Sequence, residues 1–249
     1  MKSTGFPSFC RWSCLLLLSV SPGALPLVHA AEGPASSPPA PRRERVLTQA
    51  EQQALTPDQV IESLREGNRR FVSNDLTARD HSAMVRQAAQ GQFPKAVVLS
   101  CLDSRIPVED VFDRGIGDLF VARIAGNFVN EDILGSMEFG CQVSGAKVIL
   151  VLGHESCGAV KSAIDDVQVG NITAMLSKIR PAVAQSQDFS GERASSNPRF
   201  VEHVCKRNIT RTLEQIRAGS PMLRTLEDEG KIKIVGAYYN LHTGVVTFL

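Results

Sequence analysis

Two short segments of the 249-residue chain carry side chains that can bind a metal ion. The first holds Cys101, Asp103 and Arg105, and the second holds His154 and Cys157. Thiolates and imidazoles are ligands that Zn²⁺ prefers, and three protein ligands leave the fourth tetrahedral position free for water. The pattern therefore predicts a catalytic zinc site, with one ion per subunit held by the two cysteines and the histidine, rather than a closed structural site.

Asp103 is expected to act on the proton of the bound water. Two thiolates cancel the charge of Zn²⁺, so the ion attracts electrons from its water less strongly than it would with three histidines. A neighbouring base should therefore help, and Asp103 lies two residues from Cys101. Arg105 follows two residues later and, in an extended segment, points to the same side. An arginine–carboxylate pair keeps the carboxylate ionised and oriented.

Each motif taken alone has a simpler explanation. A His-x-x-Cys pair occurs by chance in many proteins, a cysteine after a strand is usually a small buried residue, and Asp-x-Arg is usually a structural ion pair. The main competitor is a Cys101–Cys157 disulfide, because the N-terminus predicts export to an oxidising compartment. That disulfide would leave His154, Asp103 and Arg105 without a role.

The two segments meet only if the strands that precede them lie in one sheet. Apolar runs predict strands at 96–100, 119–122, 147–152, 232–239 and 245–248, and helical spacing predicts helices at 132–144, 157–167, 171–185 with a kink at Pro181, 197–216 and 220–230. This alternation predicts an α/β fold with a mainly parallel central β-sheet flanked by helices and an antiparallel edge strand near the C-terminus. Ligands bind beyond the carboxyl ends of such strands, where both segments should lie.

The first 95 residues are expected to supply an export signal, a tether and a helical arm. Residues 1–30 predict a secretory signal peptide, with basic residues before a short apolar run and a cleavage site after Ala30. Residues 31–55 predict a Pro/Ala/Ser-rich tether, and the zinc domain is expected over 56–249. Thr56-Pro57-Asp58-Gln59 predicts the start of the helical arm. We therefore expect a periplasmic protein without a membrane span after cleavage, because the apolar run is too short to cross a bilayer.

Composition excludes some classes of function. Lys and Arg number 27 against 26 Asp and Glu, a net charge of +1, which argues against a nucleic-acid-binding protein. Aromatic residues are 6% of the chain, too few to favour surfaces on which bases stack. Cys141 and Cys205 fall on predicted helices and are expected to be buried free thiols, with a disulfide between them as the alternative.

The two motifs together resemble the β-class carbonic anhydrases, over the chain from about residue 57 to the C-terminus. The resemblance is carried by Cys101-x-Asp103-x-Arg105, Gly153-His154-x-x-Cys157-Gly158, Gly117-Asp118-Leu119-Phe120-Val121-x-Arg123, Ala125-Gly126-Asn127 and Glu138-Phe139. It implies a lyase that reversibly hydrates CO2 to bicarbonate and a proton by attack of zinc-bound hydroxide. It also implies Cys101, His154 and Cys157 as the zinc ligands.

The resemblance further implies self-association, as a homodimer or a dimer of dimers, with a substrate pocket completed across the dimer interface. Gln92 matches the glutamine that hydrogen-bonds the substrate, and Phe120, Ala125 and Phe139 match the apolar wall. The backbone N–H of Gly158 matches a donor to the bound oxyanion. Ordinary core packing is the alternative for these lining residues.

Some proteins of this class close the site at low pH, when the aspartate becomes a fourth zinc ligand. In those, a bicarbonate-binding trio includes a tryptophan three residues before the first cysteine ligand. That position here is Val98, although Arg123 and Tyr239 match the other two members. We therefore expect an open site, with Asp103 as fourth ligand only in a closed state.

Two further functions fit the same residues. Hydrolysis of a CO2 analogue such as CS2 or COS would use the same fold, and a non-catalytic zinc-binding protein would need neither the Asp103–Arg105 pair nor Gln92. His81, His203 and His242 are candidates for proton transfer to solvent by residue type alone.

Overall fold

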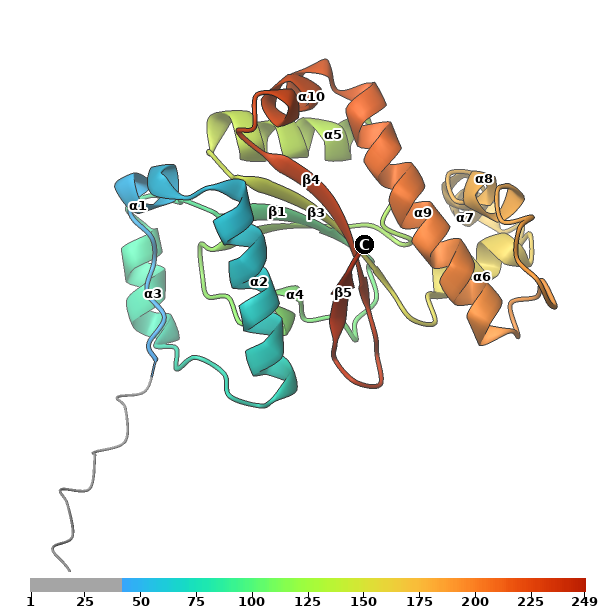
Figure 1. Cartoon of the computed structure of the whole chain (residues 1–249), viewed down its shortest axis with the longest axis horizontal. Helices are drawn as coiled ribbons and strands as arrows, with labels where there is room; N and C mark the ends of the chain where they lie inside the picture. Colours follow the sequence, from blue (N-terminus) through green and yellow to red (C-terminus); the bar gives the residue numbers. More distant parts are fainter. Residues whose placement is uncertain (1–41) are drawn as a thin grey trace, which may run out of the picture. The chain divides into compact units, whose positions relative to one another are not determined.

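A computed structural model describes residues 42–249, and these form a five-stranded sheet flanked by helices (Figure 1). The strands are β1 (Ala96–Ser100), β2 (Leu119–Arg123), β3 (Val148–His154), β4 (Lys233–Tyr239) and β5 (Val246–Phe248). Their order across the sheet is β2-β1-β3-β4-β5, and every neighbouring pair is parallel except β4 and β5. The predicted α/β fold, with its antiparallel edge strand, is confirmed.

Helices make up the larger part of the other described residues. They are α1 (Gln49–Ala54), α2 (Pro57–Val72), α3 (His81–Ala88), α4 (Val108–Val111), α5 (Glu131–Glu138), the π-helix η1 (Phe139–Val143), α6 (Gly158–Ile164), α7 (Gly170–Leu176), α8 (Arg180–Ala184), α9 (Pro198–Gly219) and α10 (Pro221–Asp228). Within the described residues, none of these helices has the length and apolar character needed to cross a bilayer.

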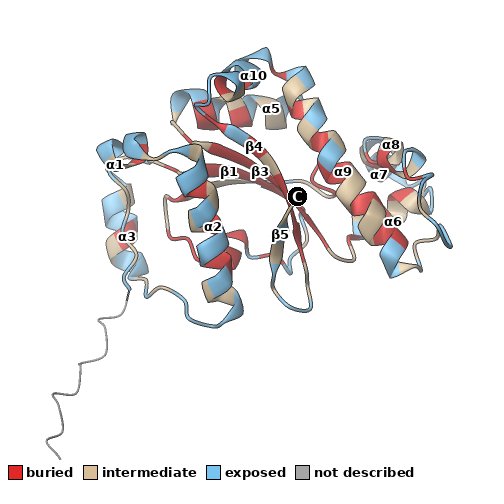
Figure 2. Ribbon diagram, viewed as in Figure 1, coloured by how far each residue is buried: buried red, intermediate tan, exposed pale blue. Residues whose placement is uncertain are grey.

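The sheet is covered on both faces. A Cβ added to Gly153 of β3 would lie 2.6 Å from an atom of α9, and one added to Gly140 of η1 would lie 2.5 Å from Val97, which the strand register places on the same face. On the opposite face, the guanidinium of Arg65 in α2 lies 4.0 Å from the centre of the Phe248 ring. Figure 2 shows the result, since β1 and β3 are buried throughout. Their continuously apolar sequences are typical of such strands.

Local sequence signals account for where several helices begin. The side chain of Thr56 accepts the N–H of Gln59, whose side chain accepts the N–H of Thr56 in return, so α2 starts where predicted. The expected kinked helix at 171–185 is instead two helices, α7 and α8. Pro181 lies at the start of α8, because a residue without an N–H is tolerated in the first turn of a helix but interrupts its interior.

The described structure begins before the expected start at Thr56, which corrects the tether boundary. Helix α1 lies wholly before Thr56. Arg43, also before Thr56, forms a parallel bridge with Ala78. Gln52 of α1 is buried, and its side-chain amide donates to the carbonyls of Pro94 and Ser144, each at 2.7 Å. The expected signal peptide and residues 31–41 of the tether lie outside the described residues, so periplasmic localisation stays a prediction.

Asp113 links α2 to the loop that follows α4. Its side chain is fully buried, and its carboxylate accepts Nε–H of Arg70 at 2.6 Å, Nη2–H of Arg79 at 2.9 Å and the hydroxyl of Thr77 at 2.6 Å. Burial alone would raise the pKa of this carboxyl, but the hydrogen bonds from Thr77 and Arg70 outweigh it and lower the pKa. The ionised carboxylate therefore joins three segments of the chain.

We predict that Asp113→Ala lowers the free energy of unfolding by about 3–5 kcal/mol, because it removes the buried carboxylate from Arg70 and Arg79 and leaves Arg79 only the exposed Asp110. Denaturant unfolding followed by circular dichroism measures the loss. Asp110→Ala is a matched control, since Asp110 also contacts Arg79, at 2.8 Å, but is 52% exposed. That variant should lose less than about 1 kcal/mol, and equal losses for both would contradict the prediction.

Candidate metal centre

Three metal-binding side chains meet at the carboxyl ends of β1 and β3. Cys101 directly follows β1, His154 is the last residue of β3, and Cys157 immediately precedes α6. All three are buried, and their ligand atoms lie within 4.8 Å of one another. The Sγ atoms of the two cysteines are 3.9 Å apart and both thiols are free, so the competing disulfide is absent from the structure. Cys141 and Cys205 are also buried and free, as predicted.

The imidazole of His154 is oriented for metal binding. Its Nδ1 lies 2.9 Å from the carbonyl oxygen of Glu155. Because a carbonyl only accepts, Nδ1 carries a proton, and in the neutral imidazole Nε2 then holds the lone pair that can bind a metal. Nε2 is buried without a hydrogen-bond partner among the described residues, a costly state for a polar atom. A zinc ion would satisfy it, and metal-binding histidines usually donate their other N–H in this way. The residues present therefore fit the predicted zinc ion.

The two thiols differ in acidity because they share a hydrogen bond. The contact with Cys157 lowers the pKa of Cys101, and the N–H of Gly126, 3.3 Å from Cys101 Sγ, lowers it further. The same contact, together with burial, raises the pKa of Cys157. The pocket thus favours one thiolate, and a divalent cation would stabilise the second.

Asp103 lies beside this group and is held by Arg105. The guanidinium donates through Nε to Oδ1 at 2.9 Å and through Nη2 to Oδ2 at 2.6 Å, and the backbone N–H of Arg105 donates to Oδ1 at 2.9 Å. Oδ2 is 3.9 Å from Nε2 of His154. The hydrogen bonds from Arg105 lower the pKa of Asp103 to about 2. The structure thus brings the aspartate and the arginine together as the sequence predicts, with the carboxylate bound to arginine.

Arg123, which matches a member of the bicarbonate-binding trio, also has a structural role. It is the last residue of β2, and it donates through Nε to the carbonyl of Cys101 at 3.0 Å and through Nη2 to the carbonyl of Asp103. It therefore holds the backbone that carries both side chains. The sequence contains a clue to this role, because Arg123 directly follows the predicted strand 119–122. In the structure it pairs with Ser100 of the parallel strand β1.

Two of the expected pocket residues lie at the metal end of the sheet. Ala125 precedes Gly126, whose N–H contacts Cys101, and Gly158 is the first residue of α6. The remaining three, Gln92, Phe120 and Phe139, lie elsewhere in the chain's own fold.

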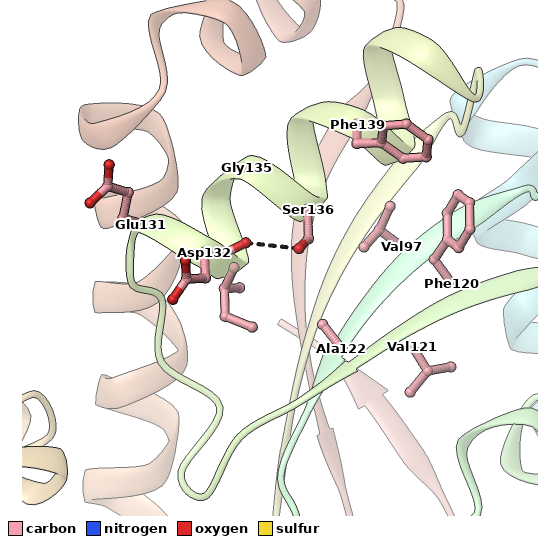
Figure 3. A pocket seen from close by; sticks show the side chains of 10 residues that line it. Val97, Phe120, Val121, Ala122, Glu131, Asp132, Gly135, Ser136 and Phe139 are labelled. Atoms are coloured by element: carbon pink, nitrogen blue, oxygen red, sulfur yellow. Dashed lines mark hydrogen bonds between the residues drawn. The ribbon is translucent and has the colours of Figure 1, made fainter.

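Phe120 and Phe139 line a groove of about 760 Å³ beside β2, together with Val97 (Figure 3). Val97 pairs with Phe120 and lies four residues before Cys101, a separation of about 13 Å along a strand. Gln92 precedes β1, so the whole strand, about 16 Å, separates it from Cys101. Within one chain, Phe120, Phe139 and Gln92 are therefore too far from the metal-binding group to contact it.

The amino-acid sequence is similar to those of known proteins. Residues 96–246 match the carbonic anhydrase family. The chain is 33% identical over 191 residues to carbonic anhydrase 2 of Mycobacterium tuberculosis, covering 73% of this chain and 87% of that protein. It is 34% identical over 191 residues to a carbonic anhydrase of Mycolicibacterium smegmatis, covering 74% and 89%.

Solved structures share the fold at lower identity. The β-carbonic anhydrase CafA of Aspergillus fumigatus superposes with a TM-score of 0.60 at 22% identity, covering 77% of this chain and 89% of that chain. The Coccomyxa β-carbonic anhydrase in complex with acetazolamide superposes with a TM-score of 0.59 at 24% identity, covering 76% and 84%.

We predict that Cys157→Ser removes bound zinc, because a serine hydroxyl does not replace a thiolate as a ligand. Zinc content measured by atomic absorption should fall from about one ion per chain to near zero. Cys141→Ser is the matched control, since Cys141 is also a buried free thiol but lies on η1, away from the site. Full zinc retention by Cys157→Ser would contradict the ligand assignment.

Proposed function

Because the chain belongs to the β-class carbonic anhydrases, we propose that it reversibly hydrates CO2 to bicarbonate and a proton at a zinc ion held by Cys101, His154 and Cys157. The observation that carries the proposal is the convergence of two sulfurs and one imidazole within 4.8 Å. The unpartnered Nε2 of His154 supports it. Zinc bound there would lower the pKa of a coordinated water molecule toward neutrality.

Asp103 orients the reacting water rather than storing its proton. An efficient general base has a pKa near the working pH, whereas Arg105 holds the pKa of Asp103 at about 2. An ionised carboxylate only accepts hydrogen bonds, so it fixes the direction of an O–H donor beside Nε2 of His154, 3.9 Å away. The proton itself must pass to solvent. Arg105 keeps the carboxylate charged and correctly turned.

The groove beside β2 is proposed to serve the metal centre of a second copy. β2 is an edge strand, and its apolar residues are only partly buried. Such an edge favours pairing with another chain. A homodimer, alone or within a dimer of dimers, that covers this edge would place Gln92, Phe120 and Phe139 of one copy beside the metal-binding group of the other. Their separation from Cys101 within one chain supports this arrangement.

Stopped-flow measurement of CO2 hydration, with zinc content determined on the same sample, tests the proposed function. Hydration should disappear when a chelator removes zinc and return when zinc is added. A zinc-loaded protein that does not hydrate CO2 at alkaline pH, or that converts only CS2 or COS, would contradict the proposal.

We predict that Asp103→Asn lowers kcat for CO2 hydration by about 100-fold, because the amide loses the charge that orients the O–H donor. Since the pKa of Asp103 is about 2, the loss should be uniform at every pH above about 5. Zinc content should be unchanged. Asp110→Asn, at an exposed aspartate on α4, should retain full activity. An Asp103→Asn enzyme with normal kcat would exclude this role.

We also predict that two inactive chains complement each other. One chain of the dimer carries Gln92→Ala and the other carries Cys157→Ser. If Gln92 serves the metal centre of the opposite chain, both substitutions fall in one site and the other site is intact. The mixed dimer, isolated with two affinity tags, should then recover about half of the normal activity because the two sites of a symmetric dimer are equivalent. No recovery in the mixed dimer would place Gln92 outside the partner's site.

A further inference from the structure

Two residues, Glu155 and Ser156, form the linker between the ligands His154 and Cys157. Ser156 has a φ of 52°, a left-handed conformation that is uncommon for a residue other than glycine. The position of His154 Nε2 relative to Cys157 Sγ depends on how this short linker is held.

Glu155 holds the linker through three of its own groups. Its carbonyl accepts Nδ1–H of His154 at 2.9 Å. Its N–H donates at 2.9 Å to the carbonyl of Tyr239, the last residue of β4. Its carboxylate oxygen Oε2 accepts the N–H of Leu241 at 3.0 Å and Nδ1–H of His242 at 2.8 Å. The residue that orients the metal-binding imidazole is therefore tied to the turn between β4 and β5.

This turn, residues 240–244, is itself fixed. Oδ1 of Asn240 accepts the N–H groups of His242 at 3.0 Å and Thr243 at 2.8 Å. Asn68 of α2 is buried, and its side-chain amide donates to the carbonyl of Gly244 at 2.9 Å. The turn is thus anchored to α2 as well as to the sheet, and it can serve as a rigid support.

We propose that Glu155 is a positioning residue of the metal centre. Its carboxylate, secured to the turn by His242 and Leu241, holds the carbonyl that keeps the His154 imidazole in the metal-binding orientation. This inference rests on the proposed zinc-dependent function. Neither Glu155 nor His242 touches the reacting atoms, and both act through His154. Groups that orient a metal ligand typically change metal affinity by about 10–100-fold when they are removed.

An ordinary surface ion pair would have no such effect. His203 on α9 and Asp188 form a similar contact, with Nε2 of His203 3.1 Å from a carboxylate oxygen of Asp188, whose side chain is 59% exposed. Exposed pairs of this kind contribute about 0–1 kcal/mol to stability. The Glu155–His242 pair is also accessible, since His242 is 80% exposed. What distinguishes it is that the backbone of Glu155 contacts a metal-binding side chain.

Two measurements on the full chain test the inference: the rate of zinc release to a chromophoric chelator and the visible absorption spectrum of the Co²⁺-substituted protein. Glu155→Ala should release zinc at least about tenfold faster and shift the Co²⁺ bands, because the geometry at His154 changes. Glu155→Gln keeps an acceptor for the N–H of Leu241 and should restore most of the normal behaviour. His203→Ala should leave both readouts unchanged.

His242→Ala should change both readouts in the same direction but by less, because Leu241 still holds Glu155. The double variant should be no worse than Glu155→Ala alone, since both substitutions interrupt one connection. Additive effects would overturn this coupling.

The inference is overturned if Glu155→Ala releases zinc at the same rate as the unmodified protein and has the same Co²⁺ spectrum. The proposed function would then still stand. If that variant does not fold, unchanged readouts in His242→Ala, an exposed position, overturn it equally. An unmodified protein that binds no zinc would instead overturn the proposed function, and this inference with it.

Discussion

The parallel pairing of β1 with β3 is the constraint on which the metal centre depends. Five residue pairs set the register, ending at Ser100 opposite Leu152, so the segments that follow the two strands leave the sheet side by side. Both strands are buried throughout, and side chains on a strand alternate between its faces. A slip of one residue would turn the His154 imidazole away from Cys101. The buried apolar strands therefore determine where the ligands meet.

Burying Cys101, His154 and Cys157 together has an energetic cost that a bound cation would relieve. Two buried thiols lie beside a buried imidazole nitrogen that has no hydrogen-bond partner among the described residues. A divalent ion would convert these groups into ligands, so its binding free energy would also stabilise the folded state. Arg105 and Arg123 complete this electrostatic arrangement, since one fixes the carboxylate of Asp103 and the other fixes the carbonyls of the same loop.

Much of this arrangement could be predicted from local sequence patterns. The apolar runs of β1 and β3 and the residues that follow them were sufficient to predict the sheet and the convergence of Cys101 with His154. The polar helix α1 was harder to predict from the sequence. It is held in place by Gln52, whose hydrogen-bond partners Pro94 and Ser144 are distant in the chain. The contact of Glu155 with His242 spans 87 residues and depends on a turn. No local pattern reports such a contact.

The glycine at position 153 determines how closely α9 approaches the sheet. Any side chain there would collide with Ile209 and with the sulfur of Cys205, both on α9. The same helix carries Asn208, whose amide donates to the carbonyl of Gly126 at 2.8 Å, and the N–H of Gly126 reaches the sulfur of Cys101. The distance between α9 and the sheet therefore affects the hydrogen bond from Gly126 to the sulfur of Cys101. Substitutions in the packing of α9 would thus change the pKa of the Cys101 thiol without altering Cys101, His154 or Cys157.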